Sequence, residues 1–106
     1  MTLFDEREQA FENQFSHDQD LMFRVRVRRD RLAGLWAAGL LGKRGAEAES
    51  YARDLVEADV GTAGPHDVME RLSRDLHERG VGLTERQMAK ELSRISAEAR
   101  RQVMAE

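Results

Sequence analysis

The scarcity of helix-breaking residues is the feature that most constrains the fold of this chain. Its 106 residues contain a single proline, Pro65, and are rich in Ala, Leu, Arg and Glu, which all have high helix propensity. Apolar residues recur at helical spacing in successive stretches, and the short connections between these stretches favour antiparallel packing of neighbours. We therefore expect an all-α protein: a four-helix bundle with a mobile N-terminal segment that is only conditionally helical.

Four helices are expected in the bundle, at about residues 20–41, 46–59, 65–79 and 85–104. The glycines at Gly42 and Gly80 supply the left-handed conformation that ends a helix, and Pro65 suits the first position of one. The last helix is indicated most strongly, because Thr84 and Gln87 fit a capping box.

The residues expected to face the core follow from the spacing of apolar positions. In the first helix Trp36 is expected as a core anchor, although residues 23–28 also alternate like a strand. We favour a helix there because no turn signal interrupts the run and no second strand is available to pair with it. The expected core positions are Leu21, Val25, Leu32 and Trp36, then Ala48, Tyr51, Ala52, Leu55 and Val56, then Val68, Leu72 and Leu76, and finally Met88, Leu92, Ile95, Ala99 and Val103.

Residues 1–19, which we call the N-terminal segment, differ from the rest of the chain. Phe4, Phe11 and Phe15 recur at i, i+7 and i+11, so they form one aromatic line in a helix. From Thr2 to Asp20 there are six acids and one arginine, a local charge of −5. A short helix with a narrow apolar line is marginal alone in water. The segment is therefore expected either to pack on its own domain or to enter a groove on a partner.

An arginine-rich stretch follows directly. From Leu21 to Arg31 there are five arginines and one aspartate, a local charge of +4. These arginines could border a buried helix face with their charged ends in water. They could also bind an acidic partner, or pair with the acidic N-terminal segment. The overall charge of −3 argues against a nucleic-acid-binding module built on them.

Several function classes are excluded or disfavoured by composition. The chain has no cysteine, which excludes a disulfide scaffold and a thiol nucleophile. Its three histidines are scattered, and it lacks a paired-histidine metal motif and a glycine-rich phosphate loop. The longest uncharged run, Leu32–Gly42, has eleven residues, too few to span a bilayer. We expect no enzymatic activity, no cofactor, no metal, no membrane insertion and a cytoplasmic location.

Five blocks of the sequence resemble, in order, the zeta subunit of the F-type ATP synthase of alphaproteobacteria. They are Phe4–Leu21, Arg28–Gly42, Tyr51–Asp59, Asp67–Leu76 and the final helix after Gly80-Val81. The resemblance implies a regulatory inhibitor whose N-terminal segment becomes helical on entering an alpha/beta catalytic interface. There it reaches towards the gamma subunit and blocks ATP hydrolysis, while the bundle (residues 20–106) stays outside. The resemblance also implies weak adenine-nucleotide binding and a chain that is monomeric when free.

The residues expected to contact the enzyme all belong to the N-terminal segment: Phe4, Asp5, Arg7, Glu8, Phe11, Phe15 and His17. The alternative is a non-inhibitory helical interaction module whose N-terminal helix packs in cis on the bundle.

Overall fold

The protein is described by a computed structural model that covers the backbone of residues 3–61 and 66–106 and the side chains of residues 17–61 and 68–106. Every regular element in these ranges is an α-helix: α1 (Leu3–Leu40), α2 (Ala46–Gly61), α3 (His66–Glu78) and α4 (Glu85–Met104). The predicted all-α fold is confirmed, and residues 23–28 are helical rather than extended. None of the described helices is long and apolar enough to cross a membrane.

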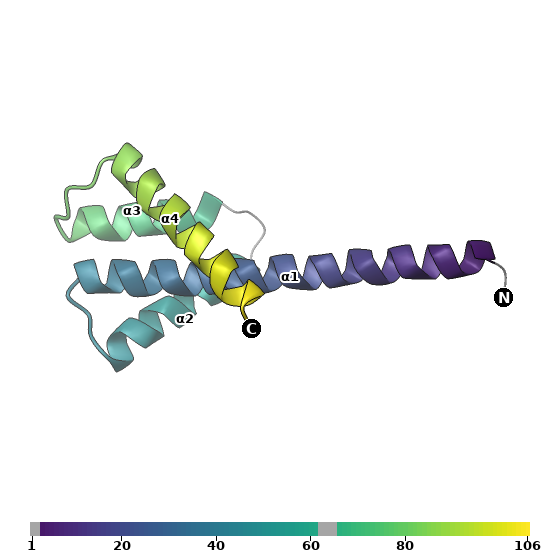
Figure 1. Cartoon of the computed structure of the whole chain (residues 1–106). Helices are drawn as coiled ribbons and strands as arrows, with labels where there is room; N and C mark the ends of the chain where they lie inside the picture. Colours follow the sequence, from purple (N-terminus) through teal and green to yellow (C-terminus); the bar gives the residue numbers. More distant parts are fainter. Residues whose placement is uncertain (1–2, 62–65) are drawn as a thin grey trace.

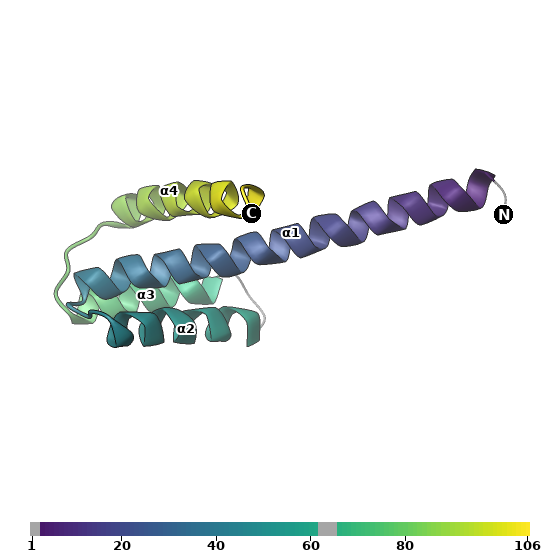
Figure 2. The same cartoon turned by 60° about the horizontal axis from the view of Figure 1, so that its bottom comes forward.

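The second half of α1 lies at the centre of the bundle. In Figure 2, α4 lies on one side of α1, while α2 and α3 lie on the other. The central helix contacts all three of the others, and α2 also contacts α3.

The first half of α1 extends beyond the other helices as a rod (Figure 1). The molecule therefore measures 63 Å along its longest axis but only 28 and 25 Å across. We expected a bundle helix beginning near residue 20, but α1 is continuous over 38 residues because neither glycine nor proline occurs between Leu3 and Ala33. A continuous helix cannot turn back onto its own second half, so the packing in cis that we considered does not fit this arrangement. The division into two domains at residue 19 stays a prediction.

Small residues, not large ones, form the most buried face of α1. Ala33, Ala37 and Ala38 are at most 1% exposed, whereas the predicted Leu32 and Trp36 are only partly buried. The reason is the close approach of α2. A Cβ atom added to Gly34 would lie 2.6 Å from the Cα of Ala52. Large side chains are accommodated only at the edges of so close a contact, which is where Leu32 and Trp36 pack against the core.

The expected core positions of the other three helices are largely confirmed. Ala48, Val56 and Leu92 are exceptions, since they are only partly buried. The confirmed set is Tyr51, Ala52, Leu55, Val68, Leu72, Leu76, Met88, Ile95, Ala99 and Val103.

The predicted helix ends are also largely confirmed. Gly42 and Gly80 have φ of +80° and +83°, as their capping roles require. At the start of α4, the Gln87 backbone N–H donates to the Thr84 hydroxyl at 3.1 Å, and the Thr84 N–H donates to the Gln87 side chain at 2.9 Å. These two bonds are the predicted capping box. The role expected of Pro65 lies outside the described residues.

Candidate partner-binding surface

The residues predicted to contact a partner all lie on the first half of α1. His17 is exposed, in agreement with a role at a surface. The side chains of the other six lie outside the described residues: Phe4, Asp5, Arg7, Glu8, Phe11 and Phe15. The backbone that carries them is helical, which is the conformation that aligns positions 4, 11 and 15 on one side. Their contacts with a partner stay a prediction.

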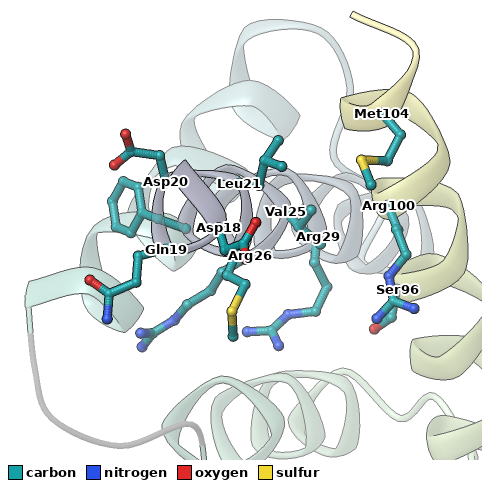
Figure 3. Close-up of a pocket in the computed structure, with 12 residues that line it drawn as sticks. Asp18, Gln19, Asp20, Leu21, Val25, Arg26, Arg29, Ser96, Arg100 and Met104 are labelled. Carbon is teal, nitrogen blue, oxygen red and sulfur yellow. The ribbon is translucent and has the colours of Figure 1, made fainter. Parts of the chain in front are cut away.

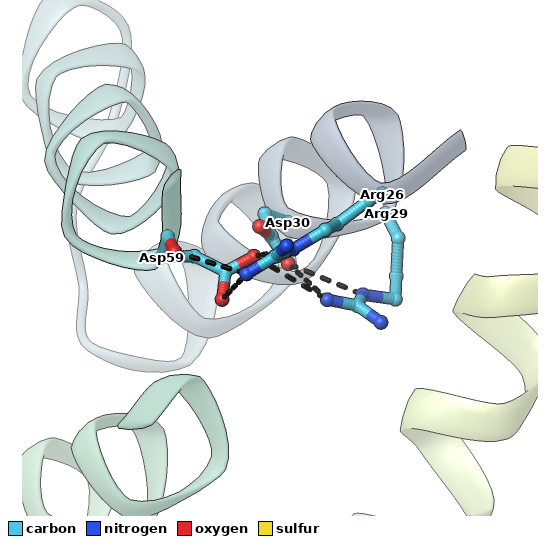
Figure 4. Close-up of polar contacts among 4 residues, drawn as sticks. All are labelled: Arg26, Arg29, Asp30 and Asp59. Atoms are coloured by element: carbon cyan, nitrogen blue, oxygen red, sulfur yellow. Dashed lines mark hydrogen bonds and ion pairs between the residues drawn. The ribbon is translucent and has the colours of Figure 1, made fainter. Parts of the chain in front are cut away.

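A buried polar cluster holds α1 against α2 where α1 leaves the bundle. Arg26 clasps the Asp59 carboxylate with two bonds, Nε to Oδ2 at 2.7 Å and Nη2 to Oδ1 at 2.9 Å (Figure 4). Its Nη2 also donates to the Asp59 carbonyl oxygen at 3.0 Å. Arg29 donates to Oδ1 of Asp30 from both Nε and Nη2, at 3.1 and 2.9 Å, and its Nη2 lies 3.5 Å from Asp59 Oδ2. Both aspartates are fully buried.

The pKa values of the two buried carboxyl groups are displaced in opposite directions. Burial and a hydrogen bond with Asp59 raise the pKa of Asp30, and against the lowering effect of Arg29 they bring it to about 7. The hydrogen bonds from Arg26 lower the pKa of Asp59 to about 2. Among the described residues, Asp30 Oδ2 is the buried side-chain atom that accepts no hydrogen bond. We infer that below pH 7 a protonated Asp30 donates to an ionised Asp59, so that two guanidinium groups face one carboxylate.

A second set of ion pairs ties α1 to the end of the chain. Glu106 pairs with Arg24 at 2.7 Å and with Arg28, which also donates to the Gln102 side chain at 2.9 Å. These contacts are more exposed than the aspartate cluster, so each contributes less to stability. Their geometric effect is clearer: α1 is held by α2 on one side and by the end of α4 on the other.

The arginines of this stretch thus form ion pairs with acidic residues of the same chain. Arg31 pairs with Glu49 at 3.1 Å, and the other four arginines pair with Asp30, Asp59 or Glu106. The arginines border a buried helix face as expected, but the charged ends of Arg26 and Arg29 bind buried aspartates and do not simply lie in water. What the sequence analysis missed is that the two buried aspartates are their partners. One signal was available, because Asp59 lies four residues after Leu55 and so continues the inward face of α2.

An open groove lies at this same junction, between α1 and the end of α4 (Figure 3). We call it the junction groove. Three large apolar side chains at its edges are strongly exposed: Met22 at 72%, Phe23 at 54% and Met104 at 66%. Its lining consists of Asp18, Gln19, Asp20, Leu21, Met22, Phe23, Val25, Arg26, Arg29, Ser96, Arg100 and Met104. No sequence pattern indicated this groove, because α1 and α4 are brought together only by the fold.

The described side chains offer no alternative chemistry. Among them, no group of three or more His, Asp or Glu residues is placed to hold a metal ion. His17 and His77 are exposed on different helices, and the side chain of His66 lies outside the described residues.

The comparisons with known proteins gave one family. Residues 1–102 match the family model described as ATPase inhibitor subunit zeta. The matched range includes the N-terminal segment, all of α2 and α3, and nearly all of α4. No curated protein matches the chain.

Proposed function

The chain belongs to the family of the ATPase inhibitor subunit zeta, and from this premise we propose that it inhibits ATP hydrolysis by inserting its N-terminal segment into the F-type ATP synthase. The segment enters an alpha/beta catalytic interface as a helix and reaches towards the gamma subunit. The protein acts as a regulatory subunit on the cytoplasmic catalytic head of an alphaproteobacterial enzyme, and it is not itself a catalyst.

One observation carries this proposal: the first half of α1 extends past the bundle as an unbroken continuation of its central helix (Figures 1 and 2). A helix of 14 residues, from Leu3 to Ser16, rises about 21 Å. That is long enough to enter the space between two subunits while the bundle stays outside. The bundle is too wide to follow, at 28 by 25 Å across.

The contacts at the base of the segment support a mechanical role. An inhibitor that stops a rotor must resist being bent or turned about its axis. The Arg26–Asp59 clasp joins α1 to α2, and the pairs of Arg24 and Arg28 with Glu106 join it to the end of the chain. Because these ties lie on different sides of α1, they oppose rotation of the segment relative to the bundle.

The first experiment measures ATP hydrolysis by the purified cognate enzyme as this protein is added. We expect the full chain to inhibit, and a version lacking residues 1–19 to have no effect. Inhibition by the shortened version would contradict the proposal, because it would place the inhibitory contacts on the bundle.

A pair of substitutions tests whether the segment binds as a helix. Phe11→Ala removes an aromatic anchor from the proposed contact, which typically costs about 2 kcal/mol at a hot spot, or roughly a thirtyfold loss of apparent affinity. Gln9→Ala is the matched control, since a helix places position 9 roughly 160° around its axis from position 11. We expect Gln9→Ala to inhibit within about twofold of the natural protein. Equal potency for all three proteins would rule out the inserted helix.

A further inference from the structure

The junction groove is lined by residues of both charges. Asp18 and Asp20 belong to the part of α1 nearer the N-terminal segment, whereas Arg29 belongs to a later turn of α1 and Arg100 to α4. In Figure 3, Asp20 lies on the opposite side of α1 from Arg29. Arg29 is held from behind by the buried aspartates, and a third of its side chain stays exposed. Arg100 is exposed, and none of the ion pairs among the described residues includes it. A partner with acidic groups is therefore attracted to Arg29 and Arg100 and repelled by Asp18.

The groove also concentrates exposed apolar surface. Six large apolar residues among the described side chains are exposed, and three of them border this groove: Met22, Phe23 and Met104. Isolated exposed apolar residues are ordinary, but several of them around one groove, beside charged residues, indicate a binding surface. Two of the three are methionines, whose flexible side chains adapt to a partner's shape.

From these features we propose that the junction groove is a second docking site, which binds an amphipathic helix with an acidic face on the catalytic head of the enzyme. The partner's apolar side covers Met22 and Met104, and its carboxylates pair with Arg100 and Arg29. The groove lies between two helices, α1 and α4, and so can receive a third along its length. This inference rests on the proposed function, because it takes the catalytic head as the partner.

The position of the groove explains why the same partner reaches it. Its first lining residue, Asp18, directly follows His17, the last residue of the predicted inhibitory contact. When the segment is inserted, the groove lies at the entrance of the subunit interface. Contacts there prolong the bound state without entering the catalytic interface, and repulsion by Asp18 limits the directions in which an acidic helix can lie.

The test measures binding of the full-length protein to the purified cognate catalytic head, with ATP hydrolysis followed in parallel. Arg100→Glu reverses the charge that the proposal places against the partner, and Met22→Ser removes apolar contact from α1. Arg86→Glu is the matched control, because Arg86 is also an exposed arginine of α4 but does not line the groove. Circular dichroism checks that each variant keeps its helix content.

We expect Arg100→Glu to weaken binding by about tenfold or more and to reduce its dependence on salt, because close charge pairs across an interface have coupling energies of this size. Met22→Ser should weaken binding severalfold, while Arg86→Glu stays close to the natural protein. Equal binding of the Arg100→Glu and Arg86→Glu variants would overturn the second docking site. The proposal would also be overturned if the natural protein self-associates and the groove variants do not, since the groove would then bind a second copy of this chain.

The two proposals fail in distinguishable ways. If the natural protein binds the head without inhibiting it, the proposed function is wrong, and the Arg100→Glu result still decides the docking site. If the natural protein inhibits and the groove variants inhibit equally well, only the docking site is wrong. A natural protein that does not bind the head refutes both.

Discussion

Replacing Asp30 with asparagine tests the buried charge cluster at the base of the N-terminal segment. Asparagine has nearly the same shape as a protonated aspartic acid. Its amide N–H can donate to Asp59, and its carbonyl oxygen can still accept from Arg29. The substitution therefore keeps the hydrogen bonds that we infer below pH 7 and removes only the ability to ionise.

The expected magnitude follows from the raised pKa of Asp30. In the folded protein its carboxyl group keeps a proton up to a pKa of about 7, whereas the ordinary value is 3.8. Between these two pH values unfolding releases a proton, so rising pH favours the unfolded chain. The natural protein should lose about 1.4 kcal/mol of stability per pH unit in this window, which is at most about 4 kcal/mol in total, with no further loss above pH 7. The asparagine variant should escape this loss.

The assay is urea unfolding followed by circular dichroism from pH 4 to pH 8. We expect the natural protein and the Asp30→Asn variant to be similar in stability near pH 4, and the variant to be the more stable at pH 8. Asp54→Asn is the control, since Asp54 is an exposed aspartate on α2. It should parallel the natural protein throughout. Asp59 behaves oppositely to Asp30, because its lowered pKa adds stability that is lost as the pH falls from about 4 towards 2.

Two results would refute this reasoning. One is a natural protein whose stability does not change between pH 4 and pH 7. The other is an Asp30→Asn variant that is less stable than the natural protein by the same amount at every pH, which would mean that the folded protein holds Asp30 as an anion.

Three further predictions concern packing. Gly34→Ala should lower the melting temperature, because its Cβ would lie 2.6 Å from the Cα of Ala52. Gly39→Ala, whose Cβ would have no atom within 4 Å, should instead raise stability by about 0.5–1 kcal/mol. If both variants shifted the melting temperature in the same direction, the close α1–α2 contact would be contradicted. Leu55→Ala, at a site with no exposed surface, should cost about 2–5 kcal/mol in urea unfolding, and a loss well below that range would mean the site is loosely packed. Deletion of Met1–Gln19 should leave a cooperative thermal transition, because the described side chains before residue 21 are exposed; disappearance of the transition would make the segment part of the core.

Helix positions were largely predictable from local patterns. The starting residues of α2, α3 and α4 agree with the sequence to within one residue. The start or end of a helix depends on residues near it in the chain. The Thr84 hydroxyl caps the start of α4, and Gly80, which adopts a positive φ, follows the end of α3. The beginning of α1 was misplaced because the sequence changes there in charge and aromatic content, and not in helix propensity.

The candidate site was only half predictable. The aromatic spacing of the N-terminal segment is a property of one helix, and it can be seen in the sequence without a fold. The junction groove and the Asp30–Asp59 pair each join residues from different helices. A periodic pattern contains no information about which helices contact one another. It also assigns buried positions by hydrophobicity, so it does not predict that an aspartate is buried.

The sequence by itself therefore determined the class of fold, the order of the helices and the unusual first nineteen residues, since all three depend on interactions between near neighbours in the chain. Only the tertiary structure decided which face of α1 is buried. The close approach of α2 at Gly34 selects alanines over Leu32 and Trp36, and it brings Asp59 within reach of Arg26. Burial then separates the pKa values of two aspartates that have the same intrinsic acidity. That separation depends on solvent exclusion by residues distant in the chain, which no local pattern records.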